Sequence, residues 1–327
     1  MKHKRVVCTV LLAVLFFFPS WQSFGQGKSW TALGTVCSVN VFEDGGDDLY
    51  TAIAIRLDEI DSQFSVNRKT SDISRVNAAA GRERVTVSKE VFTVLQTALD
   101  FAQKSGGAFD PSIGPVVTLW GICTDHPRVP SQHEIDAALS LVDWRKVSLD
   151  VSDSSVFLEK EGMALDLGGI AKGYAADELV KLLKERKVKR AIIDLGGNVY
   201  LWGNKANGKA WSVGIRNPDK NGKSVAVVLT LKGGQSVVTS GAYERYFVAG
   251  NKKYHHIIDP RTGFPCELTV DSASIVASSS MEADALSTCA FLMGKDAFVR
   301  AFPKVSYLLI LPTGKVVASK GLVWKRP

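Results

Sequence analysis

Histidine and cysteine are scarce in this chain of 327 residues, which contains five of each. The cysteines form no Cys-x-x-Cys pair, and no His-Glu-x-x-His segment occurs in the sequence. A zinc ribbon, a thioredoxin-type redox motif and the common helical type of zinc hydrolase are therefore disfavoured. A linker rich in Pro, Gly or Ser is also absent, so we predict one domain over residues 26–327.

Long apolar runs are lacking too, apart from one near the start of the chain. Residues 6–18 are almost entirely apolar, follow the basic residues Lys2, Lys4 and Arg5, and precede a short polar stretch. This run of about 13 residues is shorter than the roughly 20 that a membrane-spanning helix needs. We interpret residues 1–25 as a signal peptide cleaved before Gln26, with an uncleaved membrane anchor as the alternative. The protein is accordingly expected to be exported, to the periplasm or the outer face of the inner membrane.

A strong excess of one charge is missing. The formal net charge of +7 falls to about +4 once the three basic residues of the signal are removed, so nucleic acid is not expected as a partner. Four cysteines lie outside residues 1–25, and an oxidising compartment would allow three disulfide pairings, among which the sequence does not choose. We favour buried free thiols for Cys37, Cys123, Cys266 and Cys289.

Hydrophobic periodicity predicts helices separated by clusters of strands. Apolar residues recur every three or four positions in a helix that starts near Asp47, and Ser88 is the expected cap of a second helix that ends at Gly106 and Gly107. Further helices are expected at 170–185 and 281–293, strands at 33–42, 190–194, 199–202, 211–215, 225–231, 237–240, 243–248, 306–311 and 315–319, and a surface loop at 121–135. Strand clusters interrupted by a few packed helices favour an α+β fold with mixed or antiparallel sheets.

Residues 166–174 read Asp-Leu-Gly-Gly-Ile-Ala-Lys-Gly-Tyr and are expected to join a short strand, which ends at Asp166, to the helix at 170–185. Glycines at 168 and 169 let the backbone approach a ligand closely, and the amides of a helix start favour an anion such as a pyrophosphate. The segment matches neither Gly-x-Gly-x-x-Gly nor a Walker loop. From the residues alone, a plain turn between strand and helix is the preferred alternative.

Asp284 and Thr288 lie one helical turn apart, so a carboxylate and a hydroxyl can reach the same point. Hard oxygen ligands of this kind suit Mg²⁺, which often takes one or two carboxylates together with waters and substrate phosphates. The alternative is an exposed aspartate beside a threonine that bonds back to its own helix. Small apolar neighbours at 283, 285 and 290 predict burial, and a buried aspartate requires a partner. We expect Asp284 to serve a metal and to have no separate structural role.

Two histidines stand side by side in the segment 254–263, Tyr-His-His-Ile-Ile-Asp-Pro-Arg-Thr-Gly. In a strand, His255 and His256 point to opposite faces, so the two side chains cannot bind one metal ion. One of them can face a site while the other packs or faces solvent. The alternative is that Asp-Pro-Arg-Thr-Gly at 259–263 is only a turn.

These segments together resemble the ApbE family, the FAD:protein FMN transferases, and the resemblance runs from about residue 33 to residue 293. It is carried by Leu-Gly-Thr at 33–35, Gly-Ala-Phe-Asp-Pro at 107–111, Gly-Pro at 114–115, Leu-Trp-Gly at 119–121, residues 166–174, Asp-Leu-Gly-Gly-Asn at 194–198, Gly-Ile-Arg-Asn-Pro at 214–218, Thr-Ser-Gly at 239–241, residues 256–263 and Ala-Asp-Ala-Leu-Ser-Thr at 283–288. Each segment is modestly specific, but all of them occur in the order of the family. The resemblance implies an ApbE-like fold.

The resemblance also implies the site residues. It makes Asp284 and Thr288 side-chain ligands of Mg²⁺ and Gly169 a ligand through its carbonyl oxygen. It implies that FAD, the substrate, is contacted by Leu33, Asn67, Ala108, Phe109, Asp110, Asp166, Lys172 and Ile257. The family usually has Met where Leu33 stands, often Tyr where Asn67 stands, and in some relatives Asp where Ser287 stands.

The implied reaction is Mg²⁺-dependent cleavage of FAD, with FMN passing to a threonine of an acceptor protein through a phosphoester bond and AMP leaving. His256 is the predicted base for the threonine hydroxyl. The implied acceptors are exported or membrane-bound redox proteins, so peripheral contact with a membrane-bound acceptor is expected. Two alternatives stay open: an FAD pyrophosphatase that yields FMN and AMP, and a non-catalytic exported flavin-binding protein.

Overall fold

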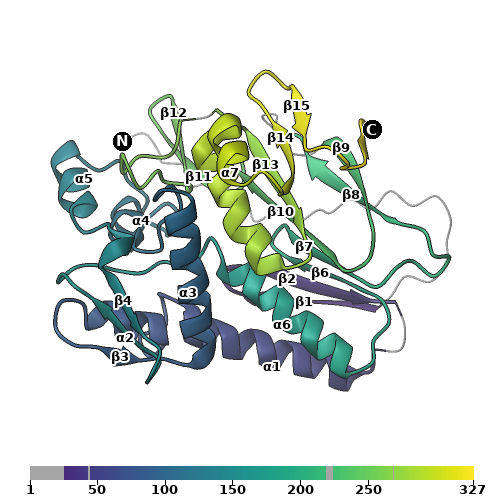
Figure 1. Ribbon diagram of the computed structural model, residues 1–327, viewed down its shortest axis with the longest axis horizontal. Coiled ribbons are helices and arrows are strands. Elements are labelled where there is room, and N and C mark those ends of the chain that lie inside the picture. The colour runs from purple at the N-terminus through teal and green to yellow at the C-terminus, as the bar shows by residue number, and fades with distance from the viewer. Residues whose placement is uncertain (1–25, 43–44, 219–223, 268) are drawn as a thin grey trace.

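A computed structural model of the chain describes residues 26–42, 45–218, 224–267 and 269–327 (Figure 1). The predicted signal peptide at 1–25 lies outside the described residues. The description therefore begins at β1, whose first residue is Gln26.

The centre of the molecule is a sheet of eight strands. Their spatial order is β1-β2-β6-β7-β10-β13-β14-β15, and each neighbouring pair is antiparallel. The strands are β1 (Gln26–Ala32), β2 (Thr35–Val41), β6 (Ala191–Leu195), β7 (Asn198–Trp202), β10 (Gln235–Gly241), β13 (Ser272–Ala277), β14 (Ser306–Ile310) and β15 (Val316–Ala318).

The two faces of this sheet are covered by different layers. Consecutive residues such as Val237 and Val238 belong to different hydrophobic clusters, because successive side chains of a strand point to opposite faces. One face packs against α6 (Ala171–Glu185) and α7 (Ser280–Ala301), which lie across the sheet in Figure 1. The other packs against a small sheet of β8 (Trp211–Arg216), β9 (Val225–Leu231) and β16 (Trp324–Lys325).

The remaining elements lie beside the central sheet, mostly on the left and lower side of Figure 1. The helices are α1 (Asp47–Phe64), α2 (Asp72–Ala78), α3 (Lys89–Lys104), α4 (Gly114–Trp120), α5 (Gln132–Leu139) and the 3₁₀ turn η1 (Trp144–Lys146). The strands are β3 (Val85–Thr86), β4 (Val147–Asp150) and β5 (Ser155–Leu158) in one sheet, and β11 (Tyr246–Ala249) and β12 (Lys252–His255) in another.

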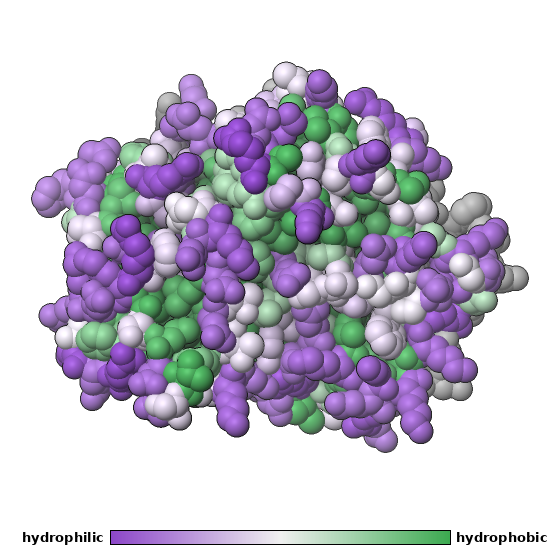
Figure 2. All heavy atoms as spheres, in the orientation of Figure 1, coloured by the Kyte–Doolittle hydropathy of each residue, from purple (hydrophilic) through white to green (hydrophobic). Residues whose placement is uncertain are grey.

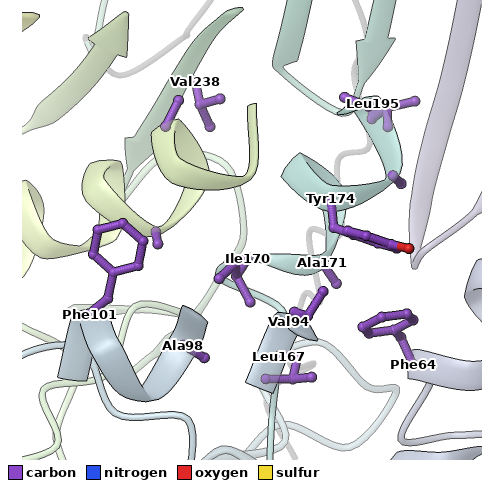
Figure 3. Packing of buried hydrophobic residues seen from close by; sticks show 14 of the residues in the cluster. Phe64, Val94, Ala98, Phe101, Leu167, Ile170, Ala171, Tyr174, Leu195 and Val238 are labelled. Carbon is purple, nitrogen blue, oxygen red and sulfur yellow. The ribbon is translucent and has the colours of Figure 1, made fainter. Parts of the chain in front are cut away.

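The glycine turn before α6 is anchored in the main core. Leu167 and Ile170, on either side of Gly168 and Gly169, are buried among side chains of α1, α3 and α6, including Phe64 and Val94 (Figure 3). Apolar burial of this kind stabilises the turn by roughly 1.5–3 kcal/mol for each large side chain. The two glycines are consequently held in place at the edge of the core.

The α+β class, the antiparallel pairing and most element positions predicted from sequence are confirmed. Ser88 caps α3 by accepting a hydrogen bond from the amide of Val91. Five predictions are wrong in part. The strand expected at 33–42 begins only at Thr35, after a turn at Leu33 and Gly34, and the helix expected at 281–293 continues to Ala301. The stretch 121–135 is not all loop, since α5 begins at Gln132. The strand expected at 243–248 begins only at Tyr246. No strand ends at Asp166, where a single bridge between Ile113 and Ala164 replaces it.

Cys37, Cys266 and Cys289 are buried free thiols, as predicted, whereas Cys123 is exposed, contrary to the prediction of burial. Burial raises the pKa of the Cys37 and Cys289 thiols to about 12. On the face shown in Figure 2, hydrophilic side chains cover most of the surface and hydrophobic residues form separate groups. Within the described ranges, no helix has the length and hydropathy required to cross a membrane.

Candidate functional site

The candidate site lies where the start of α6 meets the first turns of α7. A Cβ atom on Gly173 would lie 2.3 Å from the carbonyl oxygen of Ser280 and 2.6 Å from Cα of Met281, so only glycine allows this approach of the two helices. The α7 end of the contact is fixed by Asp177 of α6. Its carboxylate accepts hydrogen bonds from the Ser279 hydroxyl and from the amides of Ser280 and Met281, which satisfies the start of α7. The two helices that carry the predicted metal ligands are thus joined directly.

Asp284 is buried, with 4% of its surface exposed, and faces the start of α6. Its Oδ2 atom accepts a hydrogen bond of 2.9 Å from the amide of Gly173 and lies 3.4 Å from Nζ of Lys172. The Gly173 amide is one of the groups that a helix start leaves without a partner inside the helix. Asp284 therefore has a structural role that alanine would remove, contrary to the expectation from sequence.

Thr288 lies on the same face of α7, one turn after Asp284. Thr51 of α1 and Thr93 and Thr97 of α3 each donate to the carbonyl four residues earlier, at 2.8–2.9 Å. For Thr288, the carbonyl four residues earlier is that of Asp284. This carbonyl accepts a hydrogen bond from the Ser287 hydroxyl. In the described part of the chain, the Thr288 hydroxyl has no hydrogen-bond partner. The alternative in which this threonine bonds back to its own helix is therefore wrong.

Gly169 lies against Thr288, because a Cβ atom built on Gly169 would be 3.3 Å from the Thr288 hydroxyl oxygen. The structure thus brings Gly169 next to the Thr288 hydroxyl, one helical turn from the buried carboxylate of Asp284. The three predicted metal ligands are the Gly169 carbonyl, this hydroxyl and the Asp284 carboxylate. All three are hard oxygen donors, and the charge of Asp284 is only partly compensated by a lysine at 3.4 Å. These residues fit Mg²⁺. Among the residues described, no group of three or more His, Cys, Asp or Glu side chains is arranged to hold a metal, so the fit depends on this single-carboxylate set.

Lys172 and Asp166 border the same place. The ammonium of Lys172 donates to the carbonyl of Gly168 at 2.8 Å, and Asp166 Oδ1 accepts from the amide of Gly168 at 2.8 Å. Burial raises the pKa of Asp166, while Lys172 and Arg245 act in the opposite direction. The amides of Gly168 and Gly173 are already bonded to carboxylates, so they are not available to a pyrophosphate as the sequence suggested. Lys172 is the cation at this turn that a phosphate can reach.

The two adjacent histidines have different surroundings, as predicted. His255 is buried; its Nε2 bonds to the carbonyl of Cys266 and its Nδ1 accepts from the amide of Ile257, so both ring nitrogens are used. His256 bonds through Nδ1 to the carbonyl of Arg245 at 3.1 Å. A carbonyl only accepts, so Nδ1 carries the proton and the lone pair of Nε2 remains available. Burial, together with the positive charge of Arg245, lowers the pKa of His256 to about 3, which keeps the ring neutral.

The predicted flavin contacts come from five separate segments, of which the one with Asp166 and Lys172 is described above. Phe109 is buried against Gly169, with a ring carbon 3.1 Å from the Cβ position of that glycine, and Ala108 beside it is also buried. Asp110 is bonded within the chain: Oδ1 accepts from the amide and hydroxyl of Ser112, and Oδ2 accepts from the amide of Trp144. Burial raises the pKa of Asp110. Its carboxylate therefore shapes the 108–112 loop.

Leu33 and Asn67 lie in two segments that are connected through Asp61 and Arg68. The amide of Leu33 donates to Asp61 Oδ1 at 3.0 Å, and Asp61 also pairs with Arg68, the neighbour of Asn67. Asn67 itself is exposed. Ile257 is buried and follows His256 directly. Contacts through Asp61 and Arg68 connect the first two residues to each other, while Ile257 is connected to the histidines.

Sequence reasoning missed Asp177 and Arg245 and noted Ser287 only as the residue that stands where some relatives have Asp. Asp177 caps α7, Ser287 bonds to the Ser240 hydroxyl at 2.8 Å and so ties α7 to β10, and Arg245 contacts His256. Asp177 lies one turn after Gly173, a spacing that would have placed it on the α7 side of α6. Neither Ser287 nor Arg245 gives such a signal, because their partners are distant in sequence.

Comparisons with known proteins show the family of the chain. The model of the ApbE family matches residues 33–308. The chain is 41% identical over 311 residues to the FAD:protein FMN transferase of Treponema pallidum, covering 89% of this chain and 86% of that protein. It is 42% identical over 231 residues to a protein of the same name from Klebsiella pneumoniae, covering 71% of each.

Solved structures show the same fold. The ApbE protein of Thermotoga maritima superposes with a TM-score of 0.82 at 34% identity, covering 90% of this chain and 97% of that one. The flavin transferase ApbE of Vibrio cholerae gives a TM-score of 0.81 at 28% identity, with the same coverage. The protein is thus an enzyme of the transferase class that acts in flavin transfer. The chain belongs to the ApbE family.

Proposed function

We propose that this enzyme is a Mg²⁺-dependent FAD:protein FMN transferase, which joins FMN to a threonine of an acceptor protein through a phosphoester bond and releases AMP. The observation that carries the proposal is the free Thr288 hydroxyl, which faces Gly169 one turn from the buried carboxylate of Asp284. A hydroxyl without a protein partner beside a partly compensated carboxylate is suited to a hard cation. The relatives from Treponema pallidum and Klebsiella pneumoniae carry the name of this activity.

Asp284, Thr288 and the Gly169 carbonyl would hold the Mg²⁺ ion. Bound there, the metal would supply positive charge to offset the charge of the FAD pyrophosphate. Lys172 adds a second positive charge on the same side, since its ammonium already lies beside Gly168 and Asp284. Phosphoryl transfer depends mainly on positioning and charge neutralisation, which these residues provide.

His256 accepts the proton in this proposal. The threonine oxygen of the acceptor attacks the phosphorus of the FMN half, a new phosphorus–oxygen bond forms, and the bond to the AMP oxygen breaks. The hydroxyl proton passes to Nε2 of His256, because Nδ1 is held in its protonated form by the Arg245 carbonyl. His255 is unsuited to this role, since both its nitrogens are bonded to the backbone.

One experiment separates this function from its alternatives. The pure protein is incubated with FAD, Mg²⁺ and a threonine-bearing acceptor domain, followed by detection of flavin fluorescence on a denaturing gel and of AMP in solution. A transferase labels the acceptor and releases AMP. AMP without label would indicate the pyrophosphatase, an alternative that stays open because Asn67 stands where the family often has Tyr. Neither product would indicate a binding protein.

Export and the acceptor class belong to the same proposal. Residues 1–25 have the charge and hydropathy pattern of a signal peptide, so the mature protein is proposed to begin near Gln26 and to meet exported or membrane-bound redox proteins outside the inner membrane. N-terminal sequencing of the purified native protein tests this, and an intact Met1 in the membrane fraction would contradict cleavage.

A further inference from the structure

The turn between β1 and β2 holds a leucine in an unfavourable conformation. Ala32 pairs with Thr35, so the turn consists of Leu33 and Gly34, and both have positive φ, 52° and 66°. Glycine adopts this region freely, but a leucine does so rarely, because its Cβ atom crowds the backbone. Strained residues persist where the surroundings hold them, and they concentrate at functional sites. Leu33 is such a residue, and it is also a predicted flavin contact.

Two side chains from distant segments hold this turn. Asp61 of α1 accepts the Leu33 amide at 3.0 Å and is itself fixed by Nε of Arg68 at 2.8 Å. On the other side, Nη2 of Arg245 donates to the carbonyl of Gly34 at 2.8 Å. Each of the two turn residues therefore has one anchor outside the hairpin.

Arg245 has a second connection, which leads to the histidine. Its backbone carbonyl accepts from both the amide of His256, at 3.0 Å, and Nδ1 of the same residue, at 3.1 Å. One residue thus binds the turn through its guanidinium and the imidazole through its main chain. Arg245 spans the gap between the two edges of the site, one carrying Leu33 and the other carrying His256 and Ile257.

We propose that Arg245 is a positioning residue that holds the Leu33–Gly34 turn at a fixed distance from His256. The flavin ring, in contact with Leu33, is thereby placed at a fixed distance from the base. This inference rests on the proposed function, because it takes Leu33 as a ring contact. Without the guanidinium, the strained turn would relax in the free enzyme, and FAD would have to re-form it on binding. The free energy needed to re-form the turn would weaken FAD binding and so raise KM. The value of kcat would change little, since saturating FAD restores the turn and the carbonyl of residue 245 still orients His256.

The test compares Arg245→Met with Arg245→Lys and with a control, Arg75→Met. Methionine keeps the apolar stem and removes the donor, whereas lysine keeps a donor for the Gly34 carbonyl. Arg75 also donates from its guanidinium to a backbone carbonyl, that of Thr86 at 3.0 Å, and it contacts none of the predicted site residues. Two measurements are made on each variant: amide hydrogen exchange of residues 31–36 without FAD, and KM and kcat for FAD.

Arg245→Met is expected to speed exchange in residues 31–36 at least tenfold and to raise the KM for FAD at least tenfold, with kcat changed less than threefold. Arg245→Lys recovers most of both effects, and Arg75→Met shows neither. Unchanged exchange in Arg245→Met would overturn the anchoring role, and faster exchange with an unchanged KM would overturn the positioning role. Failure of the wild-type protein to bind FAD would instead refute the proposed function, while the exchange data would still decide whether Arg245 anchors the turn.

Discussion

Replacing Gly173 with alanine tests the contact between α6 and α7 that assembles the candidate metal site. The added Cβ atom would lie 2.3 Å from the Ser280 carbonyl oxygen, whereas ordinary contacts begin near 3.4 Å, so the helices must separate by about 1 Å. The atoms that it meets are backbone, so no side chain can rotate away. The amide of Gly173 also donates to Asp284, and this bond must lengthen as the helices part.

The magnitude follows from two opposing effects. Overpacking of a closely packed core costs about 1–3 kcal/mol, and a backbone clash lies at the upper end of that range. Alanine in place of glycine within a helix stabilises the folded state by about 1 kcal/mol. We expect a net loss of about 2 kcal/mol in the free energy of unfolding, which lowers Tm by roughly 3 °C in a domain of this size. Because α7, which carries Asp284 and Thr288, moves away from the start of α6, the Mg²⁺ concentration for half-maximal activity should rise at least tenfold.

Thermal unfolding followed by circular dichroism and activity assays over a Mg²⁺ titration measure the two effects separately. Gly46→Ala is the matched control, because its added Cβ atom has no neighbour within 4 Å among the described residues. Gly46 is the N-cap of α1, so this variant should lose at most about 1 kcal/mol and keep the wild-type Mg²⁺ dependence. A Gly173→Ala variant with wild-type Tm and wild-type Mg²⁺ dependence would refute the close helix contact and its role in placing Asp284.

Three further predictions concern the remaining site residues. His256→Ala should lower the rate of FMN transfer by roughly 10²-fold and leave FAD binding, measured by calorimetry, intact. A larger loss of activity in His255→Ala would show that His256 is not the base. Because burial lowers the pKa of His256 to about 3, the ring stays unprotonated at every higher pH, so kcat/KM should not fall as the pH drops from 7 to 5; an inflection near 6.5 would contradict this. Thr288→Val removes a hydroxyl without a protein partner, so Tm should be unchanged while the Mg²⁺ requirement rises, and equal Mg²⁺ dependence would exclude Thr288 as a ligand.

Local patterns in the sequence predict much of this fold. The repeat of apolar residues in α1 and the cap at Ser88 depend on neighbours within a few positions, so they are visible without tertiary structure. The spacing of Asp284 and Thr288 likewise predicts a shared face of one helix. The eight-stranded order is different, because β2 pairs with β6 across some 150 residues of chain, and no local pattern specifies that neighbour.

The parts of the site that sequence reasoning missed are made by long-range contacts. Asp284 was expected to serve only a metal, yet its carboxylate also accepts the Gly173 amide, a partner that only the meeting of two helices reveals. Leucine at position 33 carries no sequence signal of a positive φ, since the turn is held from outside by Asp61 and Arg245. Functional geometry here depends on contacts between segments, whereas the ligand types could be predicted from their local spacing.

The most direct test of the central claim is a Mg²⁺ titration of Asp284→Asn, with FMN transfer to an acceptor and AMP release both measured. Asparagine keeps an oxygen that can accept the Gly173 amide, so the fold should be retained, which the Tm checks, while the negative charge is lost. The proposed mechanism predicts that both activities fall together by at least 10²-fold and recover only in part at high Mg²⁺. A folded Asp284→Asn variant with wild-type transfer and wild-type Mg²⁺ dependence would contradict it.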